Sequence, residues 1–296
     1  DLFEPVWLTG VNTSRLGGES IRETVAPLMH RAVKYADMTV PPEPEAVPEG
    51  EEVVPVVIPT VVLGSAASQV FVMKKDEETG WNQRLFNQHS SAISCLDVHY
   101  GKNLLVTAEN NGPSSRVVIW DLLTFSVLST IPSRHGAKLI DISENGTLLL
   151  VVSADLAATV TMYEISTGRV VFARPLLLGP RTVKDSITDV RFTGTAAMFA
   201  VSSVLQGVTF FVEEGGSFMG EDGLKLYEER SGLYQAIGRP AFGAAVTELC
   251  RFEGADELVA GTEKGQLLVW HGRTVAQVAA GDARITFRTR VGRQVT

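Results

Sequence analysis

The sequence predicts an all-β fold built from repeated four-stranded antiparallel sheets. Its clearest segment is Arg116–Asp121, where an apolar, β-branched run leads into a Trp-Asp pair and a polar turn follows. Three later segments repeat this pattern of apolar residues before an aromatic: Ala158–Glu164, Gly207–Val212 and Gly265–His271. A strand closed by Trp-Asp and repeated every ~40–45 residues is typical of WD-type blades. We therefore predict a WD40-type β-propeller, of which this chain supplies about five blades of a larger ring.

The blades are predicted between residues 56 and 296, where β-branched runs alternate with turn residues. A hairpin over residues 56–74 comes first. Most WD-repeat rings have seven blades, so a chain with about five is predicted to form an incomplete ring. Four-strand units are then predicted from these segments: 93–98, 103–107, 116–121 and 126–131; 138–142, 148–153, 159–164 and 169–173; 187–192, 197–202, 208–212 and a strand after Asp222; 246–252, 257–260, 266–270 and 274–278. Residues 284–290 are predicted to start one more blade.

The first 55 residues differ from the blades in composition. Residues 1–40 are predicted to hold a short strand around Trp7 and then a helical segment, because Ser20–Glu23 has the form of a capping box. Apolar residues continue at helical spacing as far as Val33, although Pro27 predicts a kink or a later start. The helix would pack on its own domain or in a partner's groove. Residues 41–55 are acidic and proline-rich, which is typical of a linker.

Composition limits the classes of function. The chain has 296 residues, 45% of them hydrophobic, and a net charge of −8. An acidic chain lacks the basic excess of a broad nucleic-acid surface. No run approaches the ~20 apolar residues of a spanning helix, so no membrane partner is predicted. Two cysteines and no signal peptide favour the cytoplasm. We also expect the chain, which lacks an initiator Met, to be part of a longer protein.

One polar constellation is predicted to be structural. His89 precedes a first strand, Thr107 lies on the second and Trp120 on the third, so their polar groups can satisfy one another in the interior. The other histidines have no spacing that builds a metal site. The chain has neither a phosphate-binding glycine loop nor a nucleophile elbow. No enzyme activity, catalytic residue, metal or cofactor is predicted.

Candidate partner-binding residues lie at the two ends of the sequence. Arg284, Arg288, Arg290 and Arg293 form a basic ribbon, and Trp7 is an aromatic in the N-terminal segment. Arg288 and Arg290 would share one face of a strand, because side chains alternate with period two. This face would meet an acidic polymer surface, or it would keep an edge strand soluble. The two interpretations are equally weighted.

Three segments resemble the echinoderm microtubule-associated protein-like (EML) family. Gln88–His99, which reads Gln-His-Ser-Ser-Ala-Ile-Ser-Cys-Leu-Asp-Val-His, resembles the family's blade opening. Val208–Ser217 is similar to its strand, aromatic pair and Gly-Ser loop, and Gly261–Gly272 to its glycine turn and Leu-Val-Trp strand. Pro5–Gly10 stands where the family has its HELP motif, but it lacks the Arg-Gly and Arg-Asn-Asn residues. The acidic linker also departs from the family.

The resemblance implies tandem propellers and a non-catalytic scaffold that binds microtubules. Axonemal WD-repeat proteins share this blade style. The expected partners are therefore tubulin, microtubules or axonemal proteins, and the expected location is the cytoskeleton, including the axoneme of a cilium or flagellum. The alternative is a general WD40 adaptor subunit of another cytoplasmic multiprotein complex.

Overall fold

The computed structural model describes most of the predicted blade region and a strand ahead of it. The described residues are 32–40, 56–64, 68–76, 80–177, 185–193, 195–204, 207–213, 224–225, 227–231, 246–251, 257–263, 267–271, 274–279, 287–288 and 294–295. Within them the chain is all-β, with two short 3-10 turns at Tyr100–Lys102 and Gly112–Ser114 and no α-helix.

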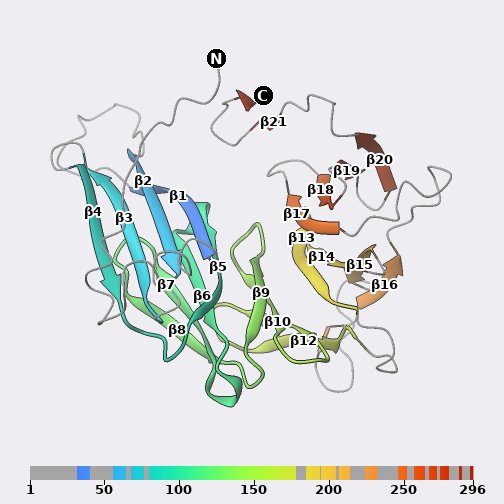
Figure 1. Cartoon of the computed structure of the whole chain (residues 1–296), viewed down its shortest axis with the longest axis horizontal. Coiled ribbons are helices and arrows are strands. Elements are labelled where there is room, and N and C mark those ends of the chain that lie inside the picture. The colour runs from blue at the N-terminus through green and yellow to red at the C-terminus, as the bar shows by residue number, and fades with distance from the viewer. Residues whose placement is uncertain are drawn as a thin grey trace. The chain divides into compact units, whose positions relative to one another are not determined.

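Each principal sheet is a four-stranded antiparallel meander, in which strands neighbouring in sequence pair in space (Figure 1). This pattern is compatible with a propeller-like β fold. The sheets are β1 (Ala32–Val40) to β4 (Gly80–Phe86) through β2 (Val56–Gly64) and β3 (Val70–Asp76); β5 (Ile93–His99), β6 (Leu104–Glu109), β7 (Arg116–Asp121) and β8 (Val127–Pro132); β9 (Ala137–Ile142), β10 (Leu148–Ser153), β11 (Thr159–Glu164) and β12 (Val170–Pro175); β13 (Ile187–Thr193), β14 (Thr195–Ser203), β15 (Gly207–Glu213) and β16 (Tyr227–Ser231); and β17 (Val246–Arg251), β18 (Glu257–Thr262), β19 (Leu267–His271) and β20 (Thr274–Ala279).

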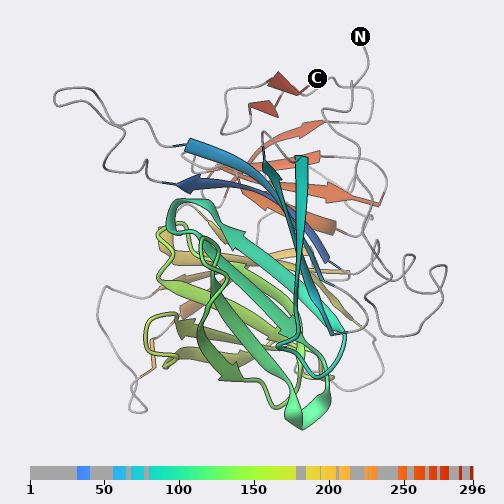
Figure 2. The ribbon, with the colours of Figure 1, turned by 90° about the vertical axis from the view of Figure 1, so that its left-hand side faces the viewer.

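The chain divides into two compact units, residues 1–138 and 139–296. In the first unit, β3 packs its Val70 and Val72 against the sheet β5–β8, whose strands run side by side in Figure 2. In the second unit, the faces of successive sheets share two apolar clusters. One cluster joins β10–β12 to β13–β16, and the other joins β14–β15 to β17–β19.

The four predicted aromatic segments occupy the same place in their sheets. Trp120, Tyr163, Phe211 and Trp270 all lie on the third strand, and each faces a residue of the second strand. This confirms that the four segments are repeats of one structural unit. The aromatic ring or its neighbour in the strand fills the interior, because apolar burial is the main source of stability.

Irregularities in the ladders recur at matching positions, which strengthens the relation between the sheets. A bulge interrupts the pairing of the third and fourth strands next to the aromatic residue in three sheets. These bulges lie between Ile119 and Trp120, between Met162 and Tyr163, and between Val269 and Trp270. Another set interrupts the first and second strands, between Ile93 and Cys95, Ile187 and Asp189, and Val246 and Glu248.

The structure corrects only the end of the predicted N-terminal helix, and the rest of that helix stays a prediction. Residues 20–31 lie outside the described residues, but Ala32 and Val33 belong to β1 and not to a helix. Strand β1 pairs with all nine residues of β2. Strand β2 is rich in β-branched residues, and the ladder it offers overrides the local helical spacing. The residues ahead of the linker therefore contribute the first strand of the first sheet.

The linker at 41–55 and the strand around Trp7 also lie outside the described residues. Near the end of the chain, β21 (Phe287–Arg288) pairs with β22 (Gln294–Val295) in a short two-stranded ladder. These residues fall in and just after the segment predicted to begin a further blade.

Candidate functional site

The predicted polar constellation forms as a buried relay across the sheet β5–β8. The indole Nε1–H of Trp120 donates to Thr107 Oγ1 at 2.8 Å, and His89 Nε2 lies 2.7 Å from the same oxygen. All three residues are buried. The segment 87–92 brings His89 over the second strand, and the ladder brings Trp120 beside it. The prediction that these three residues satisfy one another in the interior is confirmed.

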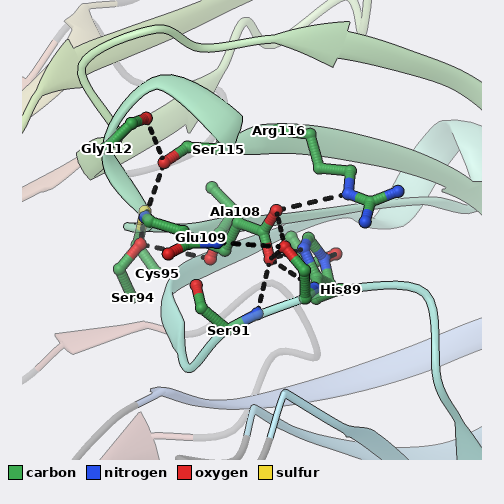
Figure 3. Close-up of polar contacts among 12 residues, drawn as sticks. His89, Ser91, Ser94, Cys95, Ala108, Glu109, Gly112, Ser115 and Arg116 are labelled. Carbon is green, nitrogen blue, oxygen red and sulfur yellow. Dashed lines mark hydrogen bonds and ion pairs between the residues drawn. The ribbon is translucent and has the colours of Figure 1, made fainter.

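A fourth residue, Glu109, completes the relay. Its carboxylate accepts the backbone N–H groups of Ser90 at 2.6 Å and Ser91 at 2.9 Å, and the Nε–H of Arg116 at 3.2 Å (Figure 3). Its Oε2 also lies 3.5 Å from His89 Nδ1. The Glu109 side chain is 0% exposed. A buried carboxylate is tolerated because these donors replace its hydration.

Burial and neighbouring charges set the protonation of this pair. Burial lowers the pKa of His89 to about 4, against the opposing attraction of Glu109, so the imidazole is neutral at pH 7. For Glu109, burial acts to raise the pKa, but the N–H groups of Ser91 and Ser90 and the nearby His89 and Arg116 together lower it. The site therefore holds a carboxylate and a neutral imidazole.

Hydrogen counting assigns the direction of the relay. Thr107 has one hydroxyl hydrogen and already accepts from Trp120. If the hydroxyl donates to His89 Nε2, the neutral imidazole carries its proton on Nδ1, which faces the Glu109 carboxylate. We assign this tautomer because it gives every group in the relay a compatible neighbour. The relay thus ties the loop before β5 to β6 and β7.

In the second unit, charged side chains join the first strands of successive sheets. Asp141 on β9 accepts the Phe192 N–H at 2.7 Å and Arg191 Nη1–H at 2.9 Å. Asp189 on β13 accepts the Leu249 N–H of β17 at 2.8 Å, and Arg191 Nε donates to the Leu249 carbonyl at 3.2 Å. Burial raises the pKa of Asp189, against the attraction of Arg191. These side chains therefore bind the backbone of the first strand in a neighbouring sheet and connect one sheet to the next.

The chemistry available at these sites is structural hydrogen bonding. Each buried carboxylate described above accepts hydrogen bonds from backbone or arginine donors, and these bonds hold strands and loops together. Burial raises the pKa of the Cys95 thiol to about 12, which keeps it protonated and a poor nucleophile. Among the described residues, no three His, Cys, Asp or Glu side chains gather as metal ligands. The described part of the chain also contains no helix that could cross a membrane.

No protein-family model and no curated protein matches this chain.

The partner-binding residues predicted from sequence stay a prediction, because four of the five lie outside the described residues. Trp7, Arg284, Arg290 and Arg293 lie outside the described residues. The backbone of Arg288 lies in β21, and its side chain is outside the description. The proposed sharing of one face by Arg288 and Arg290 stays a prediction.

Sequence reasoning missed Glu109, Asp141, Asp189 and Arg191. A signal for Glu109 was present, because Thr107 and Glu109 are two residues apart and so share one face of a strand. The other three residues lie on strands that the sequence predicted. The sequence did not indicate which neighbouring sheet would supply their hydrogen-bond partners.

Proposed function

We propose that the protein is a non-catalytic WD-repeat scaffold, in which about five four-stranded blades form part of a propeller that binds microtubules or axonemal microtubule-associated proteins. The observation that carries the proposal is the repetition of one unit in four sheets, a four-stranded meander with an aromatic on its third strand, and three of these sheets have a bulge beside that aromatic. Radially repeated meanders of this kind build propellers.

The buried polar groups support binding in place of catalysis. The relay from Trp120 to Glu109 and the contacts of Asp141 and Asp189 place hydrogen bonds within and between sheets. Such groups stiffen the strands, and a stiff sheet presents its loops in a fixed geometry. Loops on a rigid scaffold are the usual carriers of recognition. The cytoskeletal partner rests on the resemblance of the blade openings and strands to the EML family.

The test is co-sedimentation of the purified chain with taxol-stabilised microtubules at low and high salt. We expect pelleting at low salt that weakens as salt rises, because the contacts would be between exposed charges. Pelleting at neither salt concentration would overturn the cytoskeletal proposal and favour an adaptor role in another complex. An unrelated folded protein at the same concentration serves as the control and measures non-specific trapping in the pellet.

A further inference from the structure

Three loops of the first unit meet at one end of the sheet β5–β8, and we call them the three-loop platform: residues 87–92, 110–115 and 133–136. Asn111 Nδ2 donates to Ser90 Oγ at 3.3 Å, which joins the first loop to the second. Ser133 N donates to the Ser115 carbonyl at 2.9 Å, which joins the second to the third. These contacts make the loops one surface.

Each loop is also held internally. Ser115 Oγ donates to the Gly112 carbonyl at 2.8 Å and accepts the Asn111 N–H at 2.6 Å, closing the turn that Figure 3 shows around Gly112 and Ser115. In the third loop, Ser133 Oγ donates to the Gly136 carbonyl at 2.9 Å. Gly136 has φ +69°, and a Cβ there would collide with the side chain of Asn110. The platform is therefore ordered before any partner arrives, which reduces the entropy cost of binding.

The exposed charge of the platform is positive, although the whole chain carries −8. Arg134 is exposed and forms no ion pair with any described residue. Arg116, the residue that directly follows the second loop, has a side chain that is 40% exposed, and its Nε binds the Glu109 carboxylate, which is 0% exposed. None of the three loops contains an acidic residue. Asn110 and Asn111 are exposed on the second loop, and their side-chain amides supply further hydrogen-bond donors.

From this charge pattern we propose that the three-loop platform is a docking surface for an acidic, glutamate-rich protein segment. Guanidinium groups bind carboxylates through paired N–H donors, and an extended acidic segment offers several carboxylates in succession. The net negative charge of the rest of the chain repels such a segment, so the platform becomes its favoured point of approach. This inference deepens the proposed scaffold function, because it gives the chemistry of the partner and the loops that bind it.

The direct test is fluorescence polarisation of the intact chain with a labelled ten-residue glutamate peptide at low and high salt. We expect binding that weakens with salt, and Arg134→Glu should weaken it at least about fivefold, because a contact with an exposed charge is lost and replaced by repulsion. Arg134→Lys should retain most of the affinity. Hydrogen exchange of β6 and β7 should be unchanged in both variants, since Arg134 packs on no described core.

Lys102→Glu is the matched control. Lys102 is exposed in the 3-10 turn after β5, and its replacement by Glu makes the same change of charge outside the platform. It should leave the affinity within about twofold of the unmodified chain, since its distance from the peptide weakens the interaction through screening. Equal losses in Arg134→Glu and Lys102→Glu, or no loss in Arg134→Glu, would overturn the proposal. So would equal affinity for a Gly-Ser peptide of the same length.

The same variants separate this inference from the proposed function. If Arg134→Glu pellets with microtubules as well as the unmodified chain does, the platform is not the docking surface and the scaffold proposal stands. If the glutamate peptide binds through Arg134 but microtubules are not pelleted at any salt, the platform inference stands and the cytoskeletal partner is wrong.

Discussion

The sheets β5–β8 and β17–β20 carry equivalent tryptophans in different polar surroundings. Trp120 faces Leu105 across the ladder and donates to Thr107, two residues further along β6. Trp270 faces Leu258 in the same way, and the residue two further along β18 is Ala260. Within the described residues, Trp270 Nε1 is buried without a hydrogen-bond partner.

The difference extends through the whole relay. In the first sheet Glu109 pairs across the ladder with Ile93, and in the other sheet Thr262 pairs with Val246. His89 stands four residues before Ile93, and the residue four before Val246 is a phenylalanine in the sequence. Both sheets therefore have the aromatic and the bulge beside it, although only one of them has the relay. The polar relay is an addition that stabilises one sheet and its loops.

The largest effect is expected when the carboxylate of the relay is removed. Glu109→Ala leaves the Ser90 and Ser91 N–H groups, the Arg116 guanidinium and His89 without their acceptor, at a cost of about 3–5 kcal/mol in local stability. Thr262→Ala at the equivalent position should cost about 1 kcal/mol or less. Hydrogen exchange of β6–β7 and β18–β19, read by mass spectrometry, measures both. Similar costs would mean that the relay contributes no more than its counterpart.

Acid should weaken the sheet β5–β8 more than the sheet β17–β20. His89 is neutral in the fold with a pKa of about 4, so the unfolded state binds more protons below its ordinary pKa of about 6.5, and stability falls by roughly 3 kcal/mol between these values. The lowered pKa of Glu109 acts in the same direction, since its contribution is lost as pH falls through its ordinary value towards the lower pKa of the fold. Hydrogen exchange corrected for intrinsic rates, at pH 7 and pH 5, should show selective loss in β6–β7. His89→Gln should reduce this selectivity, and an unchanged difference in that variant would contradict the assignment.

A smaller effect is expected from replacing each indole by a phenyl ring. Trp120→Phe and Trp270→Phe remove similar packing area, but among the described residues only the first breaks a hydrogen bond. We expect Trp120→Phe to cost about 1–2 kcal/mol more than Trp270→Phe, because loss of the unpartnered Trp270 donor removes a desolvation penalty. Urea denaturation monitored by circular dichroism and local exchange provides the measurement. A larger cost at Trp270 would show that its indole nitrogen has a partner in solution.

The smallest effect concerns the turn after the third strand, where the sheet β5–β8, which contains the relay, differs from the sheet β9–β12. Phe125 adopts φ +58° in the first and Gly168 adopts φ +68° in the second. Phe125 is nevertheless buried, with its ring centroid 5.2 Å from that of Phe86, so packing offsets the backbone strain. Gly168→Ala lacks such packing and should cost about 1 kcal/mol. Thermal denaturation detects this change, and Gly168→Asn, which tolerates positive φ, should cost less.

Much of the sheet structure was predictable, and the failures have identifiable causes. The four strands of the sheet β5–β8 were predicted within a few residues, because β-branched runs and turn residues are local signals. The relay of His89, Thr107 and Trp120 was predicted from strand order. Strand β1 was missed because its partner β2 is separated from it by the linker, and local helical spacing was the stronger short-range signal.

The candidate site was predictable only in part. Glu109 is charged and stands at the end of a strand, where a carboxylate is normally solvated. Whether it turns inward depends on donors from Ser90 and Ser91, which lie on a separate segment. The three-loop platform has the same origin, because its second and third loops are joined by the hydrogen bond from the Ser133 N–H to the Ser115 carbonyl.

By itself, the sequence determined the strands, the repeating four-strand unit and the position of each aromatic, because alternation, turn chemistry and hydrophobicity act over a few residues. Tertiary structure alone decided that β1 joins the first sheet, that Glu109 is buried, and that Asp141 and Asp189 bind the backbones of neighbouring sheets. These outcomes depend on desolvation and on donors brought together from distant segments. Their energies exist only once the chain has folded.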